Sequence, residues 1–175
     1  EEHLRTSSDL YRKIGTPADS LLLPALTNLA TVRLEIGDDK GEQVTIREVT
    51  DVLAKVESLS PITRAYIHNA LSISFDQKGD YERGLYHQTL SAELFTEYYG
   101  QQHHLAMLIR ANLLVSYYSM DKQKELEQGL SQLYEDLHSD KLESLRFADA
   151  CNIVGSIYQN LNVLDQAEEL LSRAK

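Results

Sequence analysis

The sequence has one cysteine, no tryptophan, three prolines and no long apolar run. A single cysteine cannot form a disulfide within the chain, so a reducing compartment suits the protein and we expect a cytoplasmic location. No stretch approaches the roughly 18 consecutive apolar residues of a membrane-spanning helix, so no membrane insertion is expected. The first residues, Glu1-Glu2-His3, are neither a basic signal region nor an initiator methionine, which indicates a fragment of a longer protein.

Basic residues are also in the minority. The chain carries 17 Lys and Arg against 27 Asp and Glu, which gives a formal net charge of −10. Proteins that bind nucleic acids draw much of their affinity from clustered Lys and Arg, because these residues release counterions from the phosphates. No such cluster occurs in this sequence. We therefore expect no direct nucleic-acid partner.

Motifs that carry chemistry are missing as well, since the sequence has no phosphate-binding loop, nucleophile elbow or zinc-ligand spacing. His103 and His104 are adjacent, so on a helix their side chains point about 100° apart, and neither has a His, Asp or Glu four residues further on. We expect His68, His87 and Cys151 to be packing residues. The predictions are no metal, no cofactor and no enzymatic activity in this domain, although a domain outside it could be an enzyme.

What the sequence does contain is an internal repeat. The clearest copy starts at Ala148 and places small, apolar or aromatic residues at relative positions 4, 7, 8, 11, 20, 24 and 27, which are Cys151, Val154, Gly155, Tyr158, Ala167, Leu171 and Ala174. Similar copies start near residues 23, 65 and 108, so the spacings are 42, 43 and 40 residues. A period in this range is typical of helical solenoids, in which each repeat packs on its neighbours.

The turn between the two helices of a copy can also be read. Gly37-Asp38 and Gly79-Asp80 mark it in the first two copies, whereas Met120-Asp121-Lys122 takes its place in the third. The alignment of the third copy puts Tyr118 at position 11, where Phe75 and Tyr158 stand in the second and fourth copies. In the first copy Arg33 replaces this aromatic residue.

These positions resemble the tetratricopeptide repeat, whose pattern has Leu-Gly at 7 and 8, Tyr at 11 and Ala at 20 and 27. The period is longer than the standard length of about 34 residues. In this respect, and in the segment from Tyr99 to Ala106, the chain resembles the extended repeats of kinesin light chains and of large bacterial regulators. The resemblance implies an all-α fold, namely an α-solenoid of antiparallel helix pairs that forms a right-handed superhelix.

Local signals agree with a helical fold. Ser60-Pro61 supplies an N-cap and a first-turn proline, and Asp80 can cap the helix that follows it. Periodicity predicts no strand, and helices near 3–14, 20–36, 43–58, 61–78, 81–98, 103–119, 123–138, 141–160 and 164–174. We expect a single tetratricopeptide-like domain over residues 1–175, with four repeats starting near 23, 65, 108 and 148 and preceded by the lone helix 3–14.

The C-terminal end also suggests a fragment. The helix from Asp165 to Lys175 stops without a capping Gly, Asn or Pro, and Leu170 and Leu171 on one face call for a neighbour beyond Lys175. We therefore expect a further repeat or an effector domain in a larger multidomain protein.

In a solenoid the first helices of successive repeats line a concave groove, so equivalent positions face it in every repeat. Position 5 holds Thr27 in the first copy and asparagine in the other three, and an asparagine carboxamide can both donate to and accept from the amides of an extended peptide. The neighbouring positions 2 and 9 add six residues. The predicted peptide-binding residues are Asn69, Asn112, Asn152, Tyr66, Ile73, Ile109, Ser116, Asp149 and Ser156. Two roles stay open for the asparagines, because helix-helix hydrogen bonds or simple exposure would also explain them.

The function expected from this pattern is a scaffold or sensory module that binds a protein or peptide in its concave groove. It would regulate a separate output domain of a larger, bacterial signalling or transcription-regulatory protein. The alternative is self-association, for example as a homodimer, through the terminal face with Leu170 and Leu171. A third possibility, an accessory domain that holds a small ligand, would need a deep polar pocket.

Overall fold

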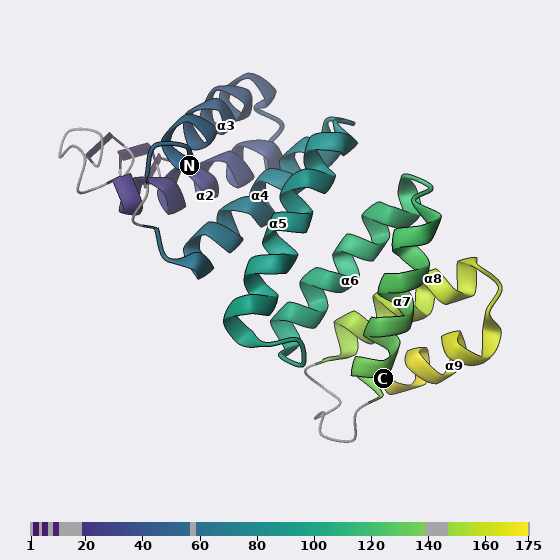
Figure 1. The fold of residues 1–175 in the computed structure, drawn as a ribbon. Coiled ribbons are helices and arrows are strands. Elements are labelled where there is room, and N and C mark those ends of the chain that lie inside the picture. The colour runs from purple at the N-terminus through teal and green to yellow at the C-terminus, as the bar shows by residue number, and fades with distance from the viewer. Residues whose placement is uncertain are drawn as a thin grey trace. The chain divides into compact units, whose positions relative to one another are not determined.

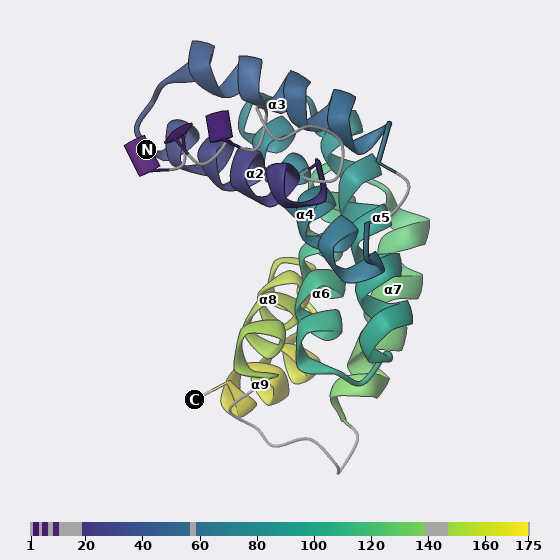
Figure 2. The ribbon, with the colours of Figure 1, turned by 90° about the vertical axis from the view of Figure 1, so that its left-hand side faces the viewer.

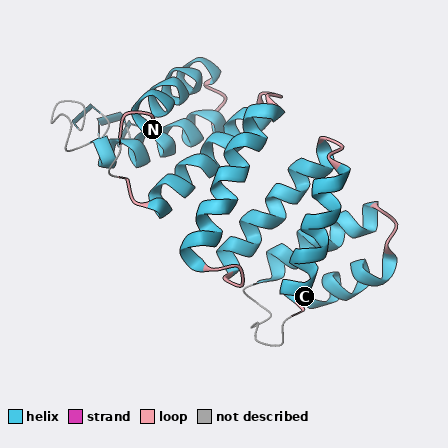
Figure 3. Ribbon diagram, in the orientation of Figure 1, coloured by secondary structure: helices cyan, strands magenta, loops and turns pink. Residues whose placement is uncertain are grey.

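The computed structural model describes residues 2–3, 5–6, 9–10, 19–56, 59–138 and 147–174. Over these ranges the chain is helical, with no strand (Figure 3). The helices shown in Figure 1 are α2 (Asp19–Glu35), α3 (Asp39–Leu53), α4 (Pro61–Gln77), α5 (Tyr81–Tyr99), α6 (His104–Ser119), α7 (Gln123–Leu137), α8 (Ala148–Asn160) and α9 (Leu164–Arg173). The predicted all-α class is confirmed.

Most of the predicted helices are found within a residue or two of their expected ends, but α3 is displaced. It begins at Asp39 and ends at Leu53, whereas 43–58 was expected. Its start is fixed by Asp38, whose side chain accepts a hydrogen bond from the Gly41 amide at 3.0 Å. The described residues between 2 and 10 are helical, and the rest of the helix expected at 3–14 lies outside the described residues, as do 141–146 of the helix expected at 141–160.

The two capping predictions hold. Ser60 accepts a hydrogen bond from the Thr63 amide at 3.2 Å, with Pro61 in the first turn of α4. Asp80 accepts from the Arg83 amide at 3.3 Å and so caps α5.

The chain divides into two compact units, residues 1–87 and 88–175, here called unit 1 and unit 2. In unit 1, α2 packs on both α3 and α4. In unit 2, α6 packs on α7 and α8, and α8 lies beside α9 (Figure 2). The prediction of one continuous domain over 1–175 stays a prediction.

One turn joins the two helices of each pair, and the four turns are equivalent. Every turn has three residues between the helices, and the middle one has a positive φ: Gly37 (74°), Gly79 (75°), Asp121 (54°) and Asn162 (60°). The residue after it donates its amide to a carbonyl five residues earlier, which belongs in turn to Arg33, Phe75, Tyr117 and Tyr158, at 2.8 to 2.9 Å. This is the C-terminal capping geometry of a Schellman motif. The turn residues are 42, 42 and 41 residues apart, so the structure itself is periodic.

The turns correct the alignment of the third repeat by one residue. Tyr117, not Tyr118, is equivalent to Phe75 and Tyr158, because it supplies the same carbonyl to the turn. The third repeat therefore starts at 107 and not at 108. Buried leucines of α7 agree with this register, since Leu126 takes the position that Ala167 holds in the fourth repeat. Asp121 adopts the left-handed conformation that glycine adopts in the first two turns, so the sequence offers no glycine by which to align this turn.

The core of unit 1 consists of the inward faces of α2, α3 and α4 together with the segment that joins α3 to α4. Its buried residues are Leu22, Leu23, Leu26, Ala30, Ile46, Val49, Leu53, Val56, Leu59, Ile67, Leu71 and Phe75. Arg33, which replaces the aromatic residue of the other repeats, instead donates to the Gly41 carbonyl at 2.9 Å and also bonds the Thr45 hydroxyl. A polar side chain thereby ties α2 to α3 at the position where the other repeats use a ring.

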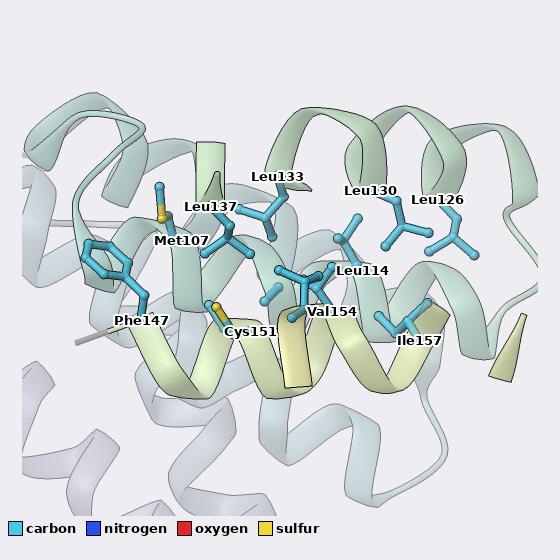
Figure 4. Packing of buried hydrophobic residues seen from close by; sticks show 13 residues of the cluster. Met107, Leu114, Leu126, Leu130, Leu133, Leu137, Phe147, Cys151, Val154 and Ile157 are labelled. Atoms are coloured by element: carbon cyan, nitrogen blue, oxygen red, sulfur yellow. The ribbon is translucent and has the colours of Figure 1, made fainter. Parts of the chain in front are cut away.

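The core of unit 2 gathers leucines of α7 against α6 and α8 (Figure 4). Cys151 lies in this core and Leu170 is fully buried in it, so the terminal face proposed for self-association does not present Leu170 to solvent. A Cβ added to Gly155 would lie 2.9 Å from Leu171 Cγ and 3.4 Å from the Ala167 carbonyl oxygen. The two helices therefore approach each other closely at Gly155 and Ala167.

Candidate functional site

The main candidate site is a cavity of about 520 Å³ in unit 1, between α2, α3 and α4. Its volume falls in the range of about 300–1,000 Å³ that is usual for ligand sites. The lining residues are Pro24, Thr27, Asn28, Ala30, Thr31, Leu34, Ile46, Val49, Thr63, Tyr66, Ile67, Asn69, Ala70, Leu71, Ile73 and Ser74. We call this cavity the α2–α4 pocket.

The pocket has a buried floor and an open mouth. Ile46 and Val49 of α3 and Leu71 of α4 are buried and form part of the floor. At the mouth, Tyr66 is 50 % exposed and Ile73 is 45 % exposed, both on α4. Exposed apolar side chains that gather around a concave surface are typical of interaction sites.

Polar atoms in the pocket are all neutral, and several are already bonded. The Thr27 hydroxyl donates to the Leu23 carbonyl at 2.8 Å, and the Thr31 hydroxyl donates to the Thr27 carbonyl at 3.2 Å. By contrast, the side chains of Asn28 and Asn69 make no hydrogen bond with any other described residue. Two unbonded carboxamides, one on α2 and one on α4, are therefore available to a ligand.

Three of the residues predicted from the sequence, Tyr66, Asn69 and Ile73, come together in this pocket. The structure adds Pro24, Thr31 and Leu34 of α2, which the sequence analysis missed. These are positions 2, 9 and 12 of the first repeat, and positions 2 and 9 supply the predicted residues of the other three repeats. The signal was thus present in the sequence.

The corrected register changes the picture in unit 2. Counting ten residues back from each turn gives Thr27, Asn69, Ala111 and Asn152, so the structural equivalent of the two asparagines in the third repeat is Ala111 and not Asn112. Asparagine thus recurs in two of four repeats rather than three. Asn112 and Asn152 make no side-chain hydrogen bond with another described residue, so the alternative that they hold neighbouring helices together is not supported.

Ile109 and Ser116 shift by one position as well. Ile109 is only 7 % exposed. The positions equivalent to Tyr66, Ile73 and Asp76 are instead filled by Leu108, Val115 and Tyr118, of which Val115 is 42 % and Tyr118 39 % exposed. Asp149, Asn152 and Ser156 are exposed along one face of α8. The binding roles of Asn112, Asn152, Ile109, Ser116, Asp149 and Ser156 stay predictions.

The buried histidines form a pair. His68 Nδ1 and His87 Nδ1 lie 2.9 Å apart in a hydrogen bond, and the His87 ring stacks on Phe75 with 5.4 Å between centroids. Burial, His68 and Arg83 lower the pKa of His87 to about 4, and burial together with Arg64 lowers the pKa of His68. A neutral, paired imidazole inside the fold fits the predicted packing role.

The remaining candidates for chemistry have ordinary structural roles. His103 caps α6 by accepting from the Leu105 amide at 3.3 Å and stacks on Tyr99. Cys151 is buried, and burial raises the pKa of its thiol. Within the ranges that the structure describes, no group of three or more His, Cys, Asp and Glu side chains is arranged to hold a metal ion. None of the described helices has the length and apolar character needed to cross a membrane.

Neither a protein-family model nor a curated protein matches the sequence at a significant level. Solved structures do match. BtubC (BKLC) from P. vanneervenii aligns with 99 % of this chain and 70 % of its own, at 19 % identity and a TM-score of 0.76. A Podosopora anserina putative kinesin light chain with nearly identical TPR-like repeats aligns with 99 % of this chain and 82 % of its own, at 16 % identity and a TM-score of 0.77. With its four equivalent turns and its eight described helices, the chain has the fold of the tetratricopeptide-like repeat proteins.

Proposed function

We propose that this protein binds a segment of another protein on the face formed by the first helices of its repeats, and that the α2–α4 pocket is the principal contact. The observation that carries the proposal is the pocket itself, in which an apolar floor lies beneath exposed Tyr66 and Ile73. Tyrosine is enriched among the residues that dominate protein interfaces, because its ring buries a large area and loses little entropy.

The carboxamides of Asn28 and Asn69 supply the second part of the proposal. Each can donate to and accept from a peptide group, so they suit the backbone of an extended segment. The similar structures named above share the fold, and one of them is described as a putative kinesin light chain. We propose in addition that the repeats act as a scaffold or sensory module and regulate a separate output domain of a larger protein.

A selection of peptides from a random phage library on the immobilised protein tests the binding proposal. Affinities of the selected peptides are then measured by calorimetry for the wild type, Tyr66→Ala, Asn69→Ala and the control Tyr81→Ala, which removes a tyrosine that is 54 % exposed outside the pocket. We expect Tyr66→Ala to weaken binding about tenfold, or about 1.4 kcal/mol, and Tyr81→Ala to leave it unchanged. Peptides that bind both tyrosine variants equally would contradict the proposal.

Self-association remains the alternative prediction, with a homodimer as its simplest form. Sedimentation velocity over a range of protein concentrations distinguishes the two, because a monomer at all concentrations would leave peptide binding as the explanation for the exposed residues.

A further inference from the structure

We infer that the α2–α4 pocket takes one uncharged apolar group, with a neutral hydrogen-bonding group held at its mouth, and that it excludes carboxylates and ammonium groups. The inference rests on the proposed function, because we expect the apolar group to be a side chain of the bound peptide. A free apolar molecule of the same chemistry is the other possible source, and the experiment below separates the two.

The lining of the pocket carries no charge. None of the 16 residues that line the pocket is Asp, Glu, Lys, Arg or His. One lining residue, Ser74, bonds a charged group through its hydroxyl, namely the buried carboxylate of Glu42, which is already paired with Lys78. A charged group that entered the pocket would lose its hydration without gaining a counter-ion, which is strongly unfavourable.

The apolar surface of the pocket reaches deep into unit 1. Ile46 and Val49 come from α3, behind the two helices that form the walls, so a side chain that reaches them is removed from water on most sides. Burial of an apolar side chain is favourable in proportion to the area removed from water. A leucine or phenylalanine side chain has the size and character to use this floor.

The mouth of the pocket offers neutral hydrogen-bonding groups. Asn28 stands on α2 and Asn69 on α4, and both carboxamides lack a hydrogen-bond partner among the described residues. A neutral carboxamide pairs well with another amide but does not offset the charge of an ion. The mouth therefore favours a peptide group on either side of the buried side chain over a free chain terminus.

The third repeat has similar residues at the positions that Pro24, Thr31 and Leu34 occupy in the first. These positions on α6 hold Leu108, Val115 and Tyr118, which are again uncharged. The second and fourth repeats each place one carboxylate at such a position, Asp76 and Asp149, and neither lines the α2–α4 pocket.

Capped amino acids test the inference directly, since they keep the peptide groups constant while the side chain changes. The probes are N-acetyl-phenylalaninamide, N-acetyl-leucinamide, N-acetyl-glutamic acid amide and N-acetyl-lysinamide, titrated at millimolar concentration into the ¹⁵N-labelled protein. We expect the phenylalanine and leucine derivatives to shift the amide signals of α2 and α4 around the pocket. The glutamate and lysine derivatives are expected to bind at least tenfold more weakly.

Two variants localise the effect. Ala70→Leu fills the pocket, and Tyr66→Ala removes part of its mouth. Each variant is expected to reduce the shifts caused by N-acetyl-phenylalaninamide several-fold. The control Tyr81→Ala is expected to leave these shifts unchanged. Tyr66→Ala keeps the test decisive if Ala70→Leu does not fold, because Tyr66 is half exposed. Equal binding of charged and apolar derivatives, or no shift with any probe, would overturn the inference.

Benzyl alcohol separates the two sources of the apolar group, because it has the ring without peptide groups. Stronger binding of N-acetyl-phenylalaninamide than of benzyl alcohol supports a peptide side chain, whereas equal binding supports a free apolar molecule and counts against the proposed function alone. Conversely, selected peptides that place a charged residue in the pocket would overturn this inference and leave the proposed function standing.

Discussion

Acid should destabilise unit 1 through the buried histidine pair. His68 and His87 are 8 % and 9 % exposed and share one hydrogen bond between their Nδ1 atoms. One of the two nitrogens donates and the other accepts, so the arrangement needs at least one neutral imidazole. Arg64 and Arg83 add positive charge near the pair and further disfavour its protonation.

The sign and size of the effect follow from the pKa of His87. It is lowered from 6.5 to about 4 in the folded state, so the unfolded chain takes up a proton at a higher pH than the folded chain does. The contribution of neutral His87 to the free energy of unfolding is complete above about pH 6.5 and is lost as the pH falls towards about 4. The difference between its pKa in the folded and unfolded states corresponds to about 3 kcal/mol. The lowered pKa of His68 acts in the same direction.

Urea unfolding followed by far-ultraviolet circular dichroism, at several pH values between about 7 and about 4.5, measures this loss. Because carboxylates also titrate in acid, the wild type is compared with the double variant His68→Leu, His87→Leu and with the exposed-histidine control His3→Gln. Leucine already stands at the equivalent positions as Leu26 and Leu170. We expect the double variant to lose most of the pH dependence and His3→Gln to retain it. Parallel curves for the wild type and the double variant would refute this reasoning.

Three further predictions concern stability and can be checked by the same urea titrations at neutral pH. Lys78→Met should destabilise the protein by about 3–5 kcal/mol, because it leaves the buried Glu42 carboxylate without its cation. Adding Glu42→Gln to this variant should restore part of the lost free energy of unfolding. Gly155→Ala should destabilise by about 1–3 kcal/mol despite the better helix propensity of alanine, because its Cβ would crowd Leu171 in unit 2, and an unchanged midpoint would count against the close approach of α8 and α9. Asp121→Gly should stabilise by about 1 kcal/mol, since φ is 54° there, and a loss of stability would show that the Asp121 side chain has a role of its own.

Much of the fold could be predicted because helix signals are local. Ser60-Pro61 and Asp80 were identified as caps from the sequence, and both act as such. The start of α3 was placed four residues too late, because Asp38 was assigned to the turn and not to a helix cap. Its hydrogen bond from the Gly41 amide starts the helix at Asp39.

The first-helix residues of unit 2 were predicted only in part, and the reason is the third turn. Glycine at a helix end indicates a left-handed residue, whereas Asp121 gives no such signal, so the register was taken from apolar residues and slipped by one. That slip put Asn112 in place of Ala111 and Ile109 in place of Leu108. The residues of the α2–α4 pocket were aligned correctly, because Gly37 and Gly79 mark the turns of the two repeats that form it.

The uncharged lining of the α2–α4 pocket has a consequence for how binding responds to ionic strength. The pocket holds no ion to be screened, so the contact made inside it should be insensitive to added salt. The chain as a whole carries a net charge of −10, and its field acts on whatever lies outside the pocket over about 8 Å at physiological ionic strength. Acidic sequences that flank a bound segment would therefore slow its association in dilute buffer, and basic flanks would speed it. Added salt would bring these two association rates together, while the dissociation rate stays nearly constant.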